Sequence, residues 1–295
     1  MYPAGDGSVR VRFLSLPSGT RVRALEAGPA DGPPVFLVHG WACSVYSFRK
    51  NLGALAAAGF RVMTADLKGH GLSDKPLGAG EYATEAMVGH LAEILDALGV
   101  GRVALVGHSM GGALALDLAM RAPERVERVA LINSVGLGAA PIISLVRALT
   151  PRLVAPLLPP LVRRWLISLV LRFAYGRLGG FSSRDVDEYW APTQFRETVL
   201  AARAMAHEFA WSPQPAERLE TLRIPALVVF GTRDRLVTAR SAERLVRALP
   251  DVRLELIEGA GHVTPEEAPD RVNGLLLDFL SRGLASLRPR ESGAA

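Results

Sequence analysis

The sequence of 295 residues has a single cysteine, Cys43, and only 6% aromatic residues. One cysteine cannot form an intrachain disulfide or a cysteine-based metal cluster, and we expect no metal site. Residues 1–6 lack the basic start and apolar core of a secretion signal. The longest apolar stretches are interrupted by proline and arginine, so none of them predicts a transmembrane helix. These absences favour a cytoplasmic protein.

Acidic residues are missing from one long segment. Residues 141–180 contain six arginines and no aspartate or glutamate, whereas the rest of the chain carries 28 basic and 29 acidic side chains. The net charge of +5 therefore belongs to this segment. No aromatic-basic motif of a nucleic-acid reader accompanies it, so the sequence predicts no nucleic-acid partner. The six arginines are Arg147, Arg152, Arg163, Arg164, Arg172 and Arg177.

The chain is 49% hydrophobic and alternates short apolar runs with amphipathic stretches. Two alternating segments around Pro17-Ser18-Gly19-Thr20 predict an antiparallel hairpin. The expected strands are residues 9–15, 21–27, 34–38, 61–65, 103–106, 126–132, 226–230 and 253–257. The expected helices are residues 48–58, 84–98, 113–121, 241–249 and 269–280. This order predicts an α/β fold with a mostly parallel central sheet and helices on both faces.

Between residues 135 and 212 the alternation stops, and prolines divide an apolar stretch into several short predicted helices. We expect a helical lid at residues 135–212, inserted into an α/β core formed by residues 1–134 and 213–295. Its apolar side chains either pack onto the core or line an apolar pocket. Its arginines form either a solvated face or a surface that weakly contacts anionic lipid. The pocket candidates are Cys43, Trp165, Trp190, His207 and Val263.

A Gly-x-Ser-x-Gly motif, Gly107-His108-Ser109-Met110-Gly111, separates a predicted strand from a predicted helix. The strand turns into the helix so tightly that side chains two positions from the serine would clash, and glycines remove that clash. The serine hydroxyl then stands at the carboxyl end of the strand, near the free amides of the helix N-terminus. Ser109 is therefore the candidate nucleophile.

A serine nucleophile needs a base, and the base needs a carboxylate that fixes its tautomer. His262 directly follows the last predicted strand, at the sheet edge where catalytic groups gather in open α/β sheets. Asp234 follows the preceding strand in the same way, whereas the alternative acid, Asp66, lies on another strand before the serine. The chain order Ser109, Asp234, His262 is the one expected for this type of site.

Acyl transfer places negative charge on an oxygen in its transition state, which pre-aimed amides must stabilise. The amide of Met110, directly after the nucleophile, is one candidate for this oxyanion hole. The amide of Trp41 is the other, because it follows the strand that ends in His39-Gly40. We interpret His39 and His108, which flank these two turns, as residues that orient the backbone.

The chain resembles the α/β-hydrolase family, and its lidded serine hydrolases in particular, over about residues 9–281. The resemblance implies that Ser109 is the nucleophile, His262 the base and Asp234 the residue that orients the base. Ala42 departs from the pattern, because many members have glycine there. A serine at position 109 argues against haloalkane dehalogenases and epoxide hydrolases, whose nucleophile is an aspartate. The matching motifs are His39-Gly40-Trp41, Asp66-Leu67-Lys68-Gly69-His70-Gly71-Leu72-Ser73, Gly107-His108-Ser109-Met110-Gly111-Gly112, Gly231-Thr232-Arg233-Asp234 and Gly261-His262.

These residues and the resemblance predict a cofactor-free serine hydrolase of carboxylic esters with an apolar acyl or alcohol group. Lipase or monoacylglycerol lipase, carbon–carbon bond hydrolase, acyltransferase and perhydrolase activities use the same apparatus and are alternatives. A ligand-sensing protein that uses the fold as a binding pocket is a non-enzymatic alternative, since a fold does not fix a function. The sequence decides neither the natural substrate nor the oligomeric state.

Overall fold

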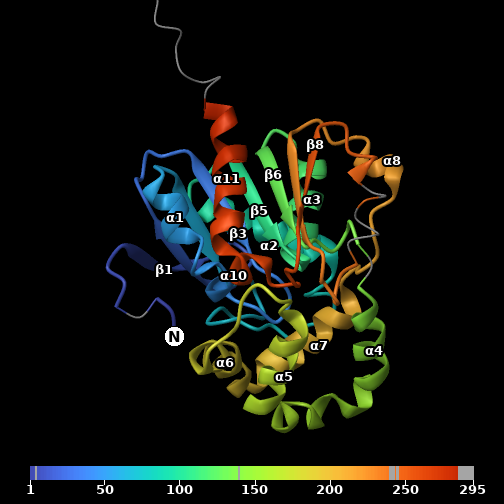
Figure 1. Ribbon diagram of the computed structural model, residues 1–295. Helices are drawn as coiled ribbons and strands as arrows, with labels where there is room; N and C mark the ends of the chain where they lie inside the picture. The colour runs from blue at the N-terminus through green and yellow to red at the C-terminus, as the bar shows by residue number, and fades with distance from the viewer. Residues whose placement is uncertain (4, 139, 239–242, 244–245, 285–295) are drawn as a thin grey trace, which may run out of the picture.

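Within residues 1–3, 5–138, 140–238, 243 and 246–284, which the computed structural model describes, eight strands form one sheet (Figure 1). The strands are β1 (Val9–Ser15), β2 (Arg21–Ala27), β3 (Pro34–Val38), β4 (Arg61–Ala65), β5 (Val103–His108), β6 (Val126–Ile132), β7 (Ala226–Gly231) and β8 (Val252–Ile257). Their order is β1-β2-β4-β3-β5-β6-β7-β8. The pairs β1–β2 and β2–β4 are antiparallel, and the other neighbours are parallel. The predicted hairpin and mostly parallel sheet are confirmed.

Helices cover both faces of this sheet, as the sequence predicted. The core helices are α1 (Leu52–Ala57), α2 (Thr84–Ala97), α3 (Met110–Arg121), α10 (Thr264–Glu267) and α11 (Pro269–Leu284). Val103 and Leu105 of β5 belong to the same buried cluster as α2 and α3. Ala104 and Val106 belong to a second buried cluster with α1 and α11, which lie together on the other side of the sheet (Figure 1). Every residue of β5 is buried, as expected for a parallel strand covered on both faces.

Three predicted helices differ from the structure or lie partly outside its described residues. The sequence predicted one helix over residues 48–58, but a separate 3₁₀ turn, η1 (Val45–Phe48), precedes a shorter α1. The hydroxyl of Ser44 accepts a hydrogen bond from the N–H of Tyr46 and so starts that turn. Helix α3 begins at Met110, directly after the serine, and not at residue 113. The helix predicted over residues 241–249 includes residues 241, 242, 244 and 245, which lie outside the described part of the chain.

The chain between β6 and β7 is mainly helical, as predicted. Its helices are α4 (Pro141–Leu149), η2 (Arg152–Leu157), η3 (Pro159–Leu161), α5 (Arg164–Ala174), α6 (Ser183–Trp190), η4 (Ala191–Gln194), α7 (Arg196–Glu208) and α8 (Ala216–Leu219). Helices α4 to α7 gather at one end of the molecule, beyond the sheet (Figure 1). No helix among the described residues combines the length and the apolar composition that crossing a membrane requires.

Asp66, the alternative acid, stabilises the fold, and none of its hydrogen bonds within the described chain is to His262. Its carboxylate accepts hydrogen bonds from Nε of Arg23 at 2.7 Å and from the backbone N–H groups of Val45 and Leu72 at 2.9 and 2.8 Å. Both charged side chains are almost fully buried. Burial raises the pKa of Asp66, but Arg23, His39 and the N–H of Leu72 together hold that pKa below its ordinary value. The pair joins β2 to the loops that follow β3 and β4.

We expect Asp66→Asn to destabilise the protein by about 3–5 kcal/mol, because it leaves the buried Arg23 charge unpaired. The lowered pKa means that the ionised carboxylate contributes its stability above about pH 4 and loses it as the pH falls further. The difference between wild type and variant should therefore shrink below that pH. Urea denaturation measured from neutral to acidic pH checks this. The exposed pair Arg125–Asp96 supplies the control, since Asp96→Asn should cost less than about 1 kcal/mol.

Candidate active site

The bend between β5 and α3 holds Ser109 in a strained backbone conformation, with φ 55° and ψ −120°. A Cβ atom at Gly107 would lie 2.4 Å from the carbonyl oxygen of Gly111. A Cβ atom at Gly111 would lie 2.1 Å from the carbonyl oxygen of Val38 in β3. Side chains at these two positions would collide with backbone, so the close packing requires glycine. The strand, turn and helix expected around the motif are all present.

The structure brings Ser109, His262 and Asp234 together. Nε2 of His262 lies 2.9 Å from Oγ of Ser109, and Nδ1 lies 2.8 Å from Oδ2 of Asp234. A carboxylate only accepts hydrogen bonds, so Nδ1 carries the ring proton and Nε2 is free to accept the serine proton. The hydroxyl, the imidazole and the carboxylate thus have the geometry in which a serine is activated for nucleophilic attack.

The carboxylate of Asp234 is fixed by several donors besides His262. One oxygen accepts hydrogen bonds from the N–H groups of Leu236 and Val237 at 2.8 and 2.9 Å. The other accepts a hydrogen bond from Nδ2 of Asn133 at 2.7 Å. Burial raises the pKa of Asp234, but His262 and these donors hold it below its ordinary value. The group is therefore ionised at neutral pH and cannot rotate without losing several hydrogen bonds.

Asn133 was missed in the sequence analysis. Its Oδ1 accepts a hydrogen bond from the hydroxyl of Thr264 at 2.6 Å, so its amide links Asp234 to the loop that carries His262. Its backbone adopts φ 47°, a conformation that asparagine tolerates better than most residues. The available signal was its position, because Asn133 follows β6 at the same sheet edge where Asp234 follows β7.

The two amides proposed for an oxyanion hole are free to bind a ligand atom. Within the described chain, the N–H groups of Trp41 and Met110 donate to no acceptor. Met110 opens α3, where a helix leaves its first amides unpaired. The loop of Trp41 borders the nucleophile, since a Cβ atom at Gly40 would lie 3.0 Å from Cβ of Ser109. Ala42 adopts φ 56°, a conformation that favours glycine and accounts for glycine at this position in the pattern that the chain resembles.

The histidines of the two turns orient the backbone, as the sequence interpretation held. Nε2 of His108 donates to the carbonyl oxygen of His262 at 2.8 Å. Burial lowers the pKa of His108 to about 3, so the ring stays neutral. Nδ1 of His39 donates to the carbonyl oxygen of Gly40 at 2.8 Å, and its Nε2 accepts the N–H of Leu67 at 3.0 Å. Each ring therefore fixes one loop of the site.

A cavity of about 340 Å³ opens above Ser109 and His262. Its lining is mostly apolar, and no lysine, arginine, aspartate or glutamate of the described chain contributes to it. Helices α4 and α5 form one wall with Ile142, Ile143, Val146, Ile167, Val170, Leu171 and Ala174. A second cavity of about 160 Å³ adjoins the first, because Trp41, Cys43 and Tyr189 line both.

Two of the five pocket candidates, Cys43 and Val263, line the cavity above Ser109. The prediction was wrong for Trp165, Trp190 and His207. Both tryptophans line a different pocket, together with Leu169 and Arg172 of α5. For Trp165 the reason is the helical spacing of α5, which turns residues 167, 170, 171 and 174 toward the cavity above Ser109 instead. Trp190 is the last residue of α6 and does not line that cavity. His207 lies away from the cavity, where its Nε2 is 2.9 Å from the carbonyl oxygen of Thr150.

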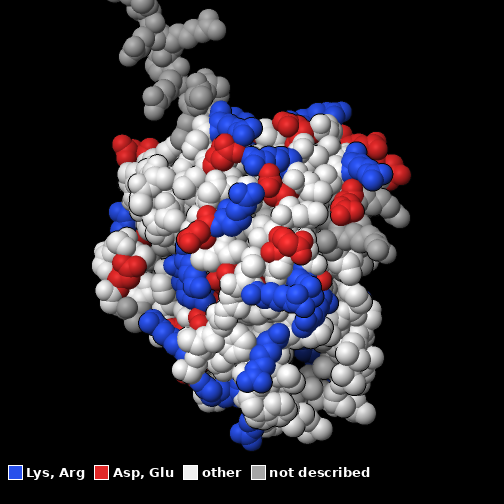
Figure 2. All heavy atoms as spheres, in the orientation of Figure 1, with Lys and Arg blue, Asp and Glu red and all other residues white. Residues whose placement is uncertain are grey.

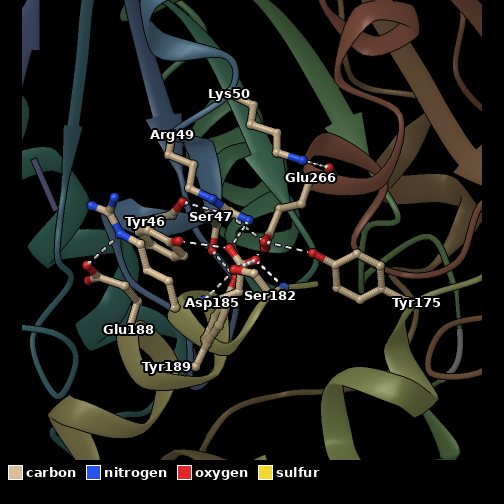
Figure 3. Close-up of polar contacts among 11 residues, drawn as sticks. Tyr46, Ser47, Arg49, Lys50, Tyr175, Ser182, Asp185, Glu188, Tyr189 and Glu266 are labelled. Atoms are coloured by element: carbon tan, nitrogen blue, oxygen red, sulfur yellow. Dashed lines mark hydrogen bonds and ion pairs between the residues drawn. The ribbon is translucent and has the colours of Figure 1, made fainter. Parts of the chain in front are cut away.

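A polar network joins α6 to the loop that carries His262 (Figure 3). Arg49 forms ion pairs with Asp185 of α6 and with Glu266 of α10, both at 2.5 Å. The hydroxyl of Tyr189 also donates to Glu266, and that of Tyr175 does so at 3.3 Å. Burial raises the pKa of Glu266, although Arg49 acts in the opposite direction. The network fixes the helical segment relative to His262, and no residue of it was singled out from the sequence.

Comparison with known proteins places this site in a family context. The family described as the alpha/beta hydrolase fold matches residues 33–269. A magnesium-chelatase 30 kDa subunit of Rhodobacter capsulatus is 33% identical over 266 residues, which cover 87% of this chain and 89% of that protein. A 2-hydroxy-6-oxononadienedioate/2-hydroxy-6-oxononatrienedioate hydrolase of Burkholderia vietnamiensis is 31% identical over 287 residues, with coverages of 94% and 93%.

A solved structure has the same fold over nearly its whole length. The 2-hydroxy-6-oxo-6-phenylhexa-2,4-dienoate hydrolase of Rhodococcus sp. strain RHA1 is 25% identical and superposes with a TM-score of 0.77. The superposition covers 92% of this chain and 99% of that one. The three relatives carry different names, so the substrate has to be argued from the site of this chain.

We expect Gly111→Ala to destabilise the protein by about 1–3 kcal/mol or more, because the new methyl group meets the backbone of β3. Gly89→Ala is the matched control, since its Cβ would meet nothing within 4 Å on the exposed face of α2. That helical substitution should stabilise by up to about 1 kcal/mol. Thermal denaturation of both variants checks the pair. Equal stability of Gly111→Ala and wild type would contradict the close packing at the bend.

Proposed function

This chain belongs to the alpha/beta hydrolase fold family, and we propose that it is a serine hydrolase that cleaves carboxylic esters with an apolar acyl or alcohol group. The observation that carries the proposal is the hydrogen-bond chain from Ser109 through His262 to Asp234 beneath an uncharged cavity. An ester needs a nucleophile, a proton carrier and an oxyanion site, and the site offers a candidate for each.

In the proposed reaction, Oγ of Ser109 attacks the ester carbonyl carbon while Nε2 of His262 takes the hydroxyl proton. The carbonyl oxygen becomes an oxyanion, which the amides of Trp41 and Met110 stabilise. The C–O bond of the ester then breaks, and His262 gives its proton to the departing alcohol. Water attacks the acyl-enzyme by the same route, with His262 as base, and releases the acid and the free serine. Asp234 stabilises the charged imidazole in both steps and does not take its proton.

The lining of the cavity supports a neutral, apolar substrate. A charged substrate group would lose its hydration there without meeting a lysine or arginine from the described chain. Water fills about 30 Å³ per molecule in the liquid and a methylene group takes a similar volume, so about 340 Å³ accommodates a chain of roughly ten carbon atoms. The smaller cavity, to whose lining Glu188 also contributes, offers space for the other half of the ester. The hydroxyl of Thr198 in that cavity is buried without a hydrogen-bond partner.

Carbon–carbon bond hydrolysis is the second candidate, because two relatives are named as hydrolases of dienoates. Those names describe substrates with carboxylate groups, and the cavity of this chain offers such a group no cationic side chain among the described residues. The ester reaction therefore fits the site better. Failure to cleave 2-hydroxy-6-oxo-6-phenylhexa-2,4-dienoate alongside rapid ester turnover would separate the two candidates.

The name of the magnesium-chelatase relative gives no reason to add a metal-dependent step to the proposed reaction. Among the described residues, no group of three histidine, cysteine, aspartate or glutamate side chains is placed to hold a metal ion. Cys43, which lines the cavity, is an unsuitable ligand or nucleophile at neutral pH because burial raises its pKa to about 12. The proposed chemistry therefore uses Ser109, His262 and Asp234 with the two backbone amides, and assigns no step to Cys43.

A fluorophosphonate probe should label the wild type at Ser109, and the enzyme should release p-nitrophenol from p-nitrophenyl esters. Ser109→Ala should abolish both, while Asp234→Asn should lower turnover by about 10⁴-fold because the imidazole loses its tautomer. Ser18→Ala, in the exposed β1–β2 turn, is the control and should label normally. Intact-mass analysis and absorbance assays measure these effects. Tight ligand binding without labelling or turnover would instead indicate a ligand-sensing protein.

The volume of the cavity predicts the chain-length profile. For p-nitrophenyl esters, kcat/KM should rise with acyl length to an optimum near ten carbons and fall beyond it. Val146→Phe narrows the wall formed by α4, so it should move the optimum to shorter esters and leave butyrate turnover nearly unchanged. Val11→Phe on the exposed face of β1 is the matched control. A profile that Val146→Phe does not shift would contradict acyl binding in this cavity.

A further inference from the structure

The outer surface of the helical segment is unusually apolar. Among the described residues, seventeen large hydrophobic side chains are exposed, and ten of them lie between residues 145 and 178. Exposed apolar side chains gathered in one segment indicate contact with a partner or a membrane, whereas singly scattered ones need no such explanation. The ten are Leu145, Leu149, Leu153, Leu157, Leu161, Trp165, Leu169, Val170, Phe173 and Leu178.

The same surface is cationic. All six arginines between residues 141 and 180 are exposed, and this segment contains no acidic residue. Only Arg164 forms an ion pair with an acid of the described chain, Asp187 of α6. Figure 2 shows blue and white atoms with hardly any red at the end of the molecule where Figure 1 places α4 to α7. Red atoms are spread over the opposite end.

Helices α4 and α5 are apolar on both sides. Val146 of α4 and Leu171 of α5 line the catalytic cavity, whereas Leu149 and Leu169 of the same helices are exposed. One layer of helices therefore separates the cavity from the outer surface. Val170 lies at the boundary, because it lines the cavity and is 51% exposed. The lining of the cavity therefore meets the outer surface at this residue.

We propose that the outer surface of residues 141–180 docks onto an anionic lipid bilayer and that the enzyme takes its apolar ester from that bilayer. Apolar side chains of such a surface lie among the headgroups and the first acyl carbons, while arginines bind lipid phosphates. The proposed docking is argued from the exposed residues themselves, whereas the uptake of an ester from the bilayer rests on the proposed function. Residues 135–212 then serve as the lid between the bilayer and Ser109.

Charge complementarity favours a lipid surface over a second copy of the chain. A symmetric dimer brings the same patch of both copies together, so the six arginines would face one another without intervening acids from this segment. Like charges in such an interface oppose association. Anionic headgroups supply the opposite charge to the arginines that form no ion pair with an acid of the described chain, which are all of the six except Arg164.

Co-sedimentation of the full chain with vesicles tests the docking. Wild type and Ser109→Ala should both bind vesicles of equal parts phosphatidylcholine and phosphatidylglycerol at least tenfold more tightly than vesicles of phosphatidylcholine alone. Added salt should weaken binding to the anionic vesicles, because it screens the arginines. The catalytically inactive variant ensures that lipid hydrolysis does not enter the measurement.

Two paired substitutions separate the contributions of charge and apolar contact. Arg152→Gln with Arg163→Gln should weaken binding to anionic vesicles by about 25-fold, or about fivefold for each charge near the lipid surface. Leu153→Ser with Leu157→Ser should weaken it by about tenfold or more. Arg102→Gln and Val11→Ser, exposed positions elsewhere on the molecule, are the matched controls and should bind like wild type. All variants should keep the wild-type melting temperature, since the substituted side chains are exposed.

Equal binding to both vesicle types, or undiminished binding of both paired variants, would overturn the proposal. A concentration-dependent dimer in vesicle-free solution, dissociated by Leu153→Ser with Leu157→Ser, would also overturn it in favour of self-association. Turnover of p-nitrophenyl butyrate by the same preparations distinguishes a failed docking site from a failed enzyme assignment. Vesicle binding without ester turnover would support the docking surface and contradict the proposed esterase activity. Ester turnover without vesicle binding would support the esterase activity and contradict the docking surface.

Discussion

The left-handed backbone at Ser109 is the constraint on which the rest of the site depends. Such a conformation costs about 1–3 kcal/mol in isolation, so neighbouring groups have to hold it. The N–H of Ser109 donates to the carbonyl oxygen of Ile132 at 3.0 Å, and its carbonyl oxygen accepts the N–H of Val135 at 3.1 Å. The glycine at position 111 meanwhile lets α3 approach the end of β3. Strands on both sides of β5 therefore fix the bend, which explains how a short motif keeps a strained serine in place.

Buried carboxylates hold the loops in place at the same edge of the sheet. Parallel strands end there in irregular loops, whose buried N–H groups need acceptors that no strand supplies. Glu267 accepts hydrogen bonds from the N–H groups of Gly176, Leu178 and Gly261 at 3.0, 2.9 and 2.7 Å. Asp66 and Asp234 bind two backbone amides each in the same manner. Most acids at this edge thus support loops, and Asp234 is distinguished by the imidazole that lies beside its second oxygen.

The features that could be predicted from the sequence are those that local patterns determine. The strands, the hairpin and the turn at Ser109 follow from apolar periodicity and glycine positions, and the order of Asp234 and His262 along the chain follows from the strands that precede them. The pocket tryptophans could not be predicted, because the directions in which α5 and α6 face depend on tertiary packing, in which Leu171 and Ala174 join Val186 and Val263 in one buried cluster. Asn133 and the network around Glu266 join residues more than 70 positions apart, so no local pattern indicates them.

The two sides of α4 and α5 have different physical roles: the inward side stabilises the fold, and the outward side forms the proposed docking surface. Ile143 and Leu171 are buried, so their inward side supplies the hydrophobic free energy that holds the segment on the core. Leu149 and Leu169 contribute much less to that free energy, because more than half of each side chain stays exposed to water in the folded chain. A segment that only had to fold would gain nothing from large apolar residues at such positions, and polar residues there would improve solubility. The outward leucines are therefore explained by contact with a partner that is not part of the folded chain. The arginines of the same segment indicate that this partner is negatively charged.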